Sequence, residues 1–165
     1  MTKKIALFVI AAGLFFTACQ KNTGTSNAEN KSAGTVETPP APKMTDVPYQ
    51  VARNYFVKNT VGDPGSPKIE TADKFNEIFG MATVMGKDGK PTAIDFSKQY
   101  VLAVILSETD LETTVAPASL QKFENNVILT YKTTVGQKQS YKTRPSFAII
   151  VDKSNDGNVV LKEIK

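Results

Sequence analysis

Beyond residue 43, apolar residues fall into short runs rich in β-branched and aromatic side chains, and turn-forming residues separate these runs. Such a pattern is typical of β-strands. The run over residues 100–106 is continuously apolar, which predicts a central strand covered on both faces. Further strands are expected at residues 49–57, 81–85, 93–94, 112–123 (with an interruption near Pro117), 127–133, 146–151 and 159–164.

One helix is expected over residues 72–79. Thr71 is a residue type that caps helix N-termini, and Gly80 is a type that ends helices. The apolar positions that recur at helical spacing are Phe75, Ile78 and Phe79. The sequence therefore predicts an α+β fold, with a mainly antiparallel sheet and one short amphipathic helix packed on it.

Two further turns are expected to join paired strands. The first covers residues 87–90 and contains Gly89, and the second covers residues 154–158 and contains Gly157. Glycine supplies the positive φ that tight hairpin turns require. The strands on either side of Gly157 are therefore expected to pair with each other.

The first 18 residues have the pattern of a secretory signal peptide. Two lysines precede an apolar run over residues 5–16, and small residues follow it. The ending Thr17-Ala18-Cys19 resembles the lipobox of bacterial lipoproteins, and the resemblance implies that Cys19 carries the lipid and becomes the first mature residue. A plain signal or a buried helix would be the alternative. The run is too short to span about 30 Å of hydrocarbon.

Residues 19–43 are expected to form the lipidated cysteine and a disordered tether. Between residues 20 and 43 the chain has Val36 as its one branched aliphatic residue and has no aromatic residue. Such a segment cannot bury enough apolar surface to offset the entropy of ordering. The remaining residues, 44–165, are enough for one hydrophobic core, and a single globular domain is expected there.

Composition argues against several classes of function. The full chain has a net charge of +4, and without residues 1–18 it has 18 Lys and Arg against 16 Asp and Glu, which leaves +2. A near-neutral domain without a basic stripe is not expected to bind nucleic acid. Histidine is absent and Cys19 is the one cysteine, so no His-based nucleophile pair and no imidazole metal site can form. With no catalytic motif, the protein is expected not to be an enzyme and to need no cofactor.

One segment matches a metal-binding pattern. Asp152, Ser154, Asp156 and Glu163 occupy positions 1, 3, 5 and 12 of a calcium loop, with Gly157 at position 6. That loop requires helices on both sides, whereas the flanking residues here are strand-like. In a hairpin, Glu163 would lie roughly 13–17 Å along its strand from the turn, too far to join the ligands. We therefore expect a hairpin turn rather than a calcium site.

A second candidate site is a polar-aromatic patch made of Tyr131, Tyr141 and Arg144. These residue types are common in ligand sites on one face of a sheet. Cross-strand packing would explain the same residues equally well. The sequence leaves both interpretations open.

Three segments resemble small lipoproteins of Bacteroides-type bacteria, namely residues 51–56, 95–101 and 139–145. The span 75–164 is also distantly similar to the C-terminal domain of PrcB-type protease-complex accessory lipoproteins. The shared pattern is an acid-Phe step (Asp95-Phe96) into an apolar strand, a middle strand, and a proline before a strand that ends in Val-Asp-Lys. Residues 113–116 stand where that family has a glycine-rich step. The resemblance implies an accessory module without catalytic residues.

These features predict a non-enzymatic, membrane-tethered lipoprotein of the bacterial cell envelope that acts as a binding or accessory domain. Its expected partners are the membrane, through the lipid on Cys19, and a protein of the envelope. Gln20 favours the outer membrane, and residues 20–22 lack the lysine-plus-acids pattern of surface export, so the domain is expected to face the periplasm. The alternatives are a carboxylate-based periplasmic hydrolase and a domain stabilised by calcium at the segment from Asp152 to Glu163.

Overall fold

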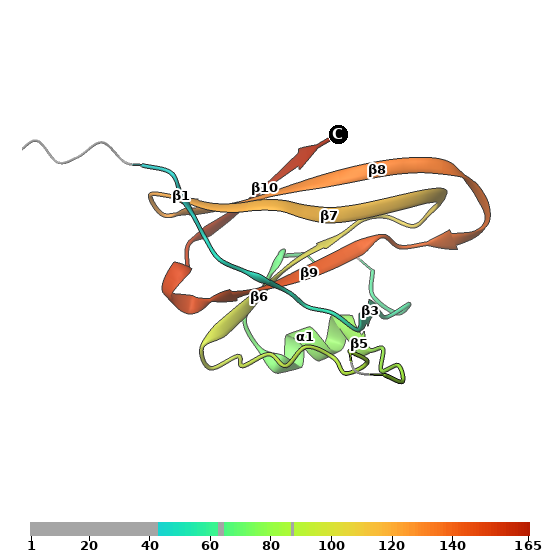
Figure 1. The fold of residues 1–165 in the computed structure, drawn as a ribbon, viewed down its shortest axis with the longest axis horizontal. Coiled ribbons are helices and arrows are strands. Elements are labelled where there is room, and N and C mark those ends of the chain that lie inside the picture. The colour runs from blue at the N-terminus through green and yellow to red at the C-terminus, as the bar shows by residue number, and fades with distance from the viewer. Residues whose placement is uncertain (1–42, 63–64, 87) are drawn as a thin grey trace, which may run out of the picture. The chain divides into compact units, whose positions relative to one another are not determined.

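The computed structural model describes residues 43–62, 65–86 and 88–165. In this part of the chain there are two four-stranded sheets, one two-stranded sheet and one α-helix (Figure 1). The predicted α+β class, with mainly antiparallel pairing, is confirmed. The predicted signal peptide (1–18) and the predicted tether (19–43), apart from its last residue, lie outside the described residues.

The first sheet is built around one long hairpin. Its strands, in spatial order, are β1 (Thr45–Asp46), β7 (Thr109–Phe123), β8 (Asn126–Thr143) and β10 (Asn158–Ile164). Phe123 lies opposite Asn126, so a two-residue turn joins β7 to β8, and Glu124 has a φ of 53° there. The register shifts between Pro117 and Ser119, as the interruption predicted near Pro117 requires.

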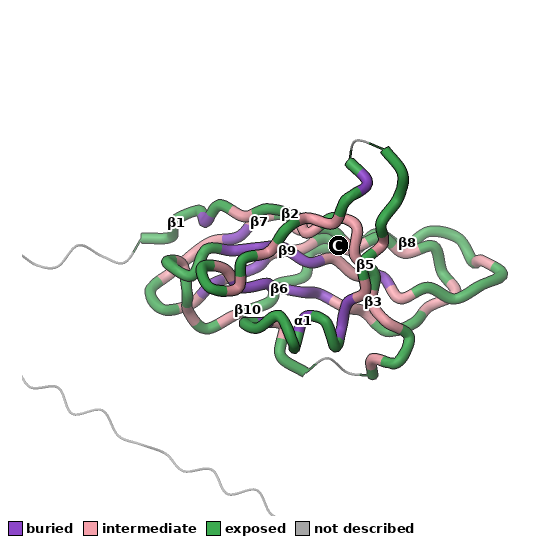
Figure 2. Tube along the Cα trace, turned by 90° about the horizontal axis from the view of Figure 1, so that it is seen from below, coloured by how far each residue is buried: buried purple, intermediate pink, exposed green. Residues whose placement is uncertain are grey.

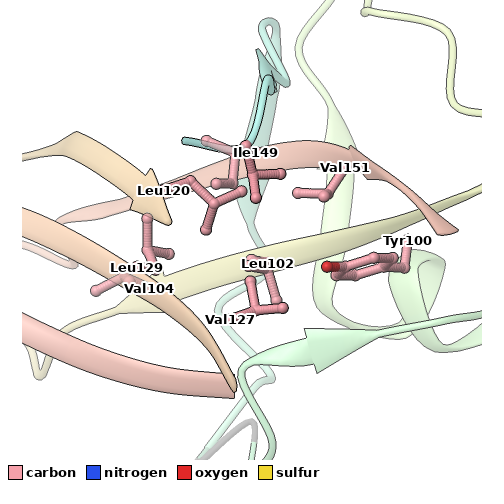
Figure 3. Close-up of a cluster of buried hydrophobic side chains, with 9 residues drawn as sticks. Tyr100, Leu102, Val104, Leu120, Val127, Leu129, Ile149 and Val151 are labelled. Carbon is pink, nitrogen blue, oxygen red and sulfur yellow. The ribbon is translucent and has the colours of Figure 1, made fainter. Parts of the chain in front are cut away.

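The second sheet has the predicted central strand at its middle. Its order is β2 (Gln50–Val51), β9 (Ser146–Asp152), β6 (Gln99–Ile105) and β4 (Lys68–Ile69). Side chains of β6 alternate between two hydrophobic clusters. Leu102 packs in one cluster with Leu120 of β7 and Leu129 of β8 (Figure 3), whereas Val101 packs in the other cluster with Phe75 and Ile78 of the helix. Figure 2 shows the buried stretches of β6 and β9 in purple. A strand covered on both faces is therefore confirmed.

The helix α1 (Ala72–Ile78) forms where its pattern predicts. Its cap is Thr71, whose hydroxyl accepts a hydrogen bond from the Lys74 backbone N–H at 3.2 Å. The predicted end at Gly80 is wrong, because Phe79 is already extended and begins β5 (Phe79–Met81). Gly80 lies within that strand, where a Cβ would come within 2.4 Å of the Phe56 ring.

The single strand predicted over residues 49–57 is wrong. Two strands form instead, β2 and β3 (Tyr55–Val57), and they belong to different sheets. The break occurs at Asn54, whose φ is 62°. The side-chain amide of Asn54 donates hydrogen bonds to the carbonyl oxygens of Asp88 and Lys90, at 2.6 and 3.0 Å. These bonds hold Asn54 in the left-handed conformation, which asparagine tolerates better than most residues do.

Among the described residues 81–86 and 88–94, the predicted strands 81–85 and 93–94 do not form a hairpin. Only β5 (Phe79–Met81) is a strand there, and it pairs antiparallel with β3. A turn does exist, since the Val84 N–H donates to the Gly89 carbonyl at 3.0 Å. The chain around it is loop, held to β3 through Asn54.

The hairpin predicted around Gly157 is also wrong. A short 3-10 helix, η1 (Lys153–Asn155), follows β9, and β10 then runs parallel to β8 in the other sheet (Figure 1). Both edges of β9 are already occupied, by β2 and β6, so β10 has no place beside it. Gly157 does not have a positive φ. Its lack of a side chain matters because a Cβ would lie 2.5 Å from the Asn125 carbonyl oxygen.

Candidate binding surface

The residues of the calcium pattern have other partners. A side-chain oxygen of Asp152 accepts the Ser154 backbone N–H at 2.8 Å and so caps η1. Asp156 forms an ion pair with Lys68 at 2.6 Å. Glu163 lies on β10 opposite Tyr131, five residues beyond the strand's first residue. In the part of the chain that the structure describes, no group of three or more His, Cys, Asp or Glu residues could hold a metal ion.

Among the described residues, three aspartates have perturbed pKa values, and all three values are lowered. The side-chain and backbone hydrogen bonds from Ser97 lower the pKa of Asp95, and those from Ser154 lower the pKa of Asp152. The hydrogen bond from Lys68 lowers the pKa of Asp156. A lowered pKa keeps a carboxylate ionised at neutral pH, whereas a general acid requires a raised one. None of these three groups suits that role.

The structure does not bring the three residues of the predicted patch together. Tyr131 is half-buried, with its ring centroid 6.2 Å from that of Phe147. Tyr141 is exposed and lies ten residues further along β8, roughly 30 Å at the rise of an extended strand. Arg144 forms an ion pair with Glu108 at 3.6 Å and donates to a backbone carbonyl.

The far edge of β10 is an accessible strand edge. Seven residues of β10 pair with β8 in unbroken register, and no described strand pairs with the other side of β10. The other terminal strands of the two large sheets are only two residues long. Residues 133–143 of β8 and 109–119 of β7 extend beyond β10 and β1, but their pairing with each other has shifts in register. The exposed apolar side chains of β10 are Val160, Leu161 and Ile164. Long, regular and apolar edges are the ones that accept another strand.

An apolar hollow lies beside this strand. It has a volume of about 180 Å³. Its lining is Gly65, Pro67, Ala103, Val104, Ile105, Leu106, Tyr131 and Leu161. Burial and the neighbouring charge of Glu163 raise the pKa of the Tyr131 hydroxyl, so this group stays neutral and can donate a hydrogen bond.

The edge of β10 and the hollow beside it have a geometry that can accept an extended peptide segment, and we call them together the β10 surface. The free N–H and C=O groups along β10 can pair with the backbone of an added strand. An apolar side chain of that strand can enter the hollow at Leu161. Of the residues lining the hollow, the sequence had singled out only Tyr131. The others were missed because β10 was expected to pair with β9.

No helix in the described ranges is long and apolar enough to cross a membrane. Comparisons with protein-family models, with curated proteins and with solved structures found no match for this chain. The resemblance to accessory lipoproteins therefore stays a prediction.

Proposed function

We propose that this protein is a non-enzymatic lipoprotein of the bacterial cell envelope that binds a partner protein by strand addition at β10. In this proposal Cys19 carries the lipid that anchors the chain in the outer membrane, and the domain faces the periplasm. The observation that carries the binding function is the β10 surface, a seven-residue edge beside an apolar hollow.

The two parts of this surface contribute different terms to binding. Backbone hydrogen bonds along β10 are independent of the partner's sequence, so they supply affinity without selection. The hollow favours a segment with an apolar residue at one position. Burying one Leu-sized or Val-sized side chain contributes roughly 1.5–3 kcal/mol, enough to distinguish segments that carry it from those that do not.

Binding without catalysis is supported by the residue types present. The chain has no histidine, and the aspartates with perturbed pKa values are held ionised by their hydrogen bonds. A carboxylate-based hydrolase would instead need a carboxyl group with a raised pKa in a pocket. The hollow beside β10 is lined by apolar residues and Tyr131, with no carboxylate among them.

Photocrosslinking in intact cells tests the proposal. A benzoylphenylalanine at Val160 of the full-length chain is expected to give a discrete adduct with one envelope protein. The same probe at Val135, an exposed valine on β8 of the same sheet, serves as the matched control and should give none. Leu161→Arg fills the hollow with a charge and should abolish the Val160 adduct.

Equal adducts at Val160 and Val135, or an adduct that Leu161→Arg leaves unchanged, would contradict strand addition at β10. The same cells grown with alkyne-palmitate test the anchor separately. Wild-type protein should be labelled and Cys19→Ala should not, and equal labelling would overturn the lipoprotein assignment.

A further inference from the structure

A second hollow lies on the side of the domain that carries the helix. It is a cleft of about 520 Å³ between α1, β5 and the segment 90–96. Most of its lining is apolar, with Phe75, Met81, Ile94 and Phe96 as the largest apolar side chains. Its volume falls within the range of small-molecule sites. It shares no lining residue with the hollow beside β10.

The floor of the cleft is a packed aromatic cluster. Phe75 is buried, and its ring centroid lies 5.0 Å from that of Tyr55 in an edge-to-face arrangement. The Phe79 ring stacks on it at 4.8 Å, and the Phe96 ring lies at 5.8 Å. Rings that fix one another in this way give the cleft a rigid apolar base.

The outer wall of the cleft is also fixed in place. Asn54 holds the carbonyls of Asp88 and Lys90, as described above, and the Tyr55 hydroxyl donates to the Thr92 carbonyl at 2.8 Å. These bonds tie the segment that carries Lys90 to β3. The cleft is therefore preformed, and a ligand would not bear the full cost of ordering its wall.

Among the described residues, Lys90 is the one charged residue in the lining of this cleft. Within the described ranges, no carboxylate lies within 4 Å of its ammonium group. An apolar cleft with one unpaired cation at its wall is complementary to a ligand that has an apolar body and one negative charge.

We propose that this cleft binds a small free amphiphile with an apolar body and a single carboxylate, which pairs with Lys90 while its apolar body lies on the aromatic floor. Decanoate is a probe of this chemistry, since it can be used well below the concentration at which it forms micelles. The proposal does not depend on strand addition at β10.

The test follows the methionine methyl groups of the chain from Gln20 onward, which contains every described residue, by NMR. Met81 lines the cleft and Met44 lies outside it, so Met44 is an internal reference. Decanoate is expected to shift the Met81 methyl signal saturably and to leave Met44 in place. Decanol should bind about twofold to fivefold more weakly, which is the affinity that one solvent-exposed ion pair contributes. Decyltrimethylammonium should bind more weakly still.

Two variants separate the charge from the cleft. Lys90→Gln should reduce decanoate affinity to that of decanol, and Lys142→Gln, an exposed lysine on β8, should change nothing. Ala93→Phe places a ring in the cleft and should abolish the Met81 shift for every probe. Equal responses of Met81 to decanoate and decyltrimethylammonium, or undiminished decanoate binding by Lys90→Gln, would overturn the proposal. So would equal shifts at Met44 and Met81.

Discussion

Gly157→Val is expected to lower the free energy of unfolding by about 3 kcal/mol, in the range for overpacking at a site that cannot relax. A Cβ at this position would lie 2.5 Å from the Asn125 carbonyl oxygen and 3.1 Å from a methyl group of Val127. The same carbonyl accepts the Asn158 N–H at 2.7 Å, at the start of the β8–β10 ladder. The substitution therefore has to push β10 away from β8.

Urea unfolding checks this prediction, with Gly62→Val as the matched control. A Cβ at Gly62 meets no atom of the described residues within 4 Å, and the φ of Gly62 is not positive. The control should change stability by less than about 0.5 kcal/mol. Similar losses for the two variants would show that close approach to Asn125 is not what requires glycine at position 157.

Tyr100 is expected to make the folded state sensitive to alkaline pH. Burial raises the pKa of its hydroxyl to about 12, the charge of Asp156 adds to the shift, and Lys68 opposes it. The unfolded-state pKa is about 10. Because the folded-state pKa is the higher one, this contribution to stability is fully present below about pH 10. It is lost as pH rises toward 12, where the loss reaches about 2 kcal/mol.

Tyr100→Phe isolates this effect. At neutral pH the variant should be about 1 kcal/mol less stable, because the hydrogen bond from the Tyr100 hydroxyl to the Asn155 carbonyl (3.3 Å) is lost. Between pH 10 and pH 12 the variant should lose less stability than wild type, so the two curves converge and cross at roughly pH 11, and the variant is the more stable protein at pH 12. The raised pKa values of Tyr55 and Tyr131 change the stability of wild type and variant equally, so their effects cancel in this comparison. If the stabilities of wild type and Tyr100→Phe changed in parallel between pH 10 and pH 12, ionisation of Tyr100 would not be the cause of the alkaline sensitivity.

The elements that the sequence predicted well are the ones whose signals are local. The apolar run over residues 100–106 forms most of the central strand β6 (Gln99–Ile105), because a continuous apolar run requires cover on both faces. The helix begins after Thr71 because its hydroxyl accepts the Lys74 N–H, a contact three residues away. Both patterns can be recognised without knowing what lies elsewhere in the fold.

The elements that the sequence mispredicted depend on distant partners. Asp152 to Gly157 has the composition of a hairpin turn, but β2 and β6 occupy both edges of β9, and neither neighbour is evident from the turn. Asn54 breaks a strand-like segment because its side chain binds carbonyls more than thirty residues away. Local composition cannot report such contacts.

The same difference applies to the candidate sites. Tyr131 could be selected from the sequence because an aromatic residue with a polar tip is typical of binding surfaces. The hollow beside it could not, since β6, β8 and β10 each contribute a wall. The sequence could not show that Lys90 and Phe75 line one cleft, because one lies in a loop and the other on the helix, and the fold brings them together.

Amide hydrogen exchange of β10 tests strand addition most directly. The measurement compares the free protein with its complex with the partner captured through Val160. Strand addition predicts that alternate amides of β10 exchange at least about tenfold more slowly in the complex, because their N–H groups gain backbone acceptors. Residues 136–142 of β8 should exchange at an unchanged rate. Unaltered exchange along β10 at saturating partner, or protection confined to residues 136–142, would contradict it.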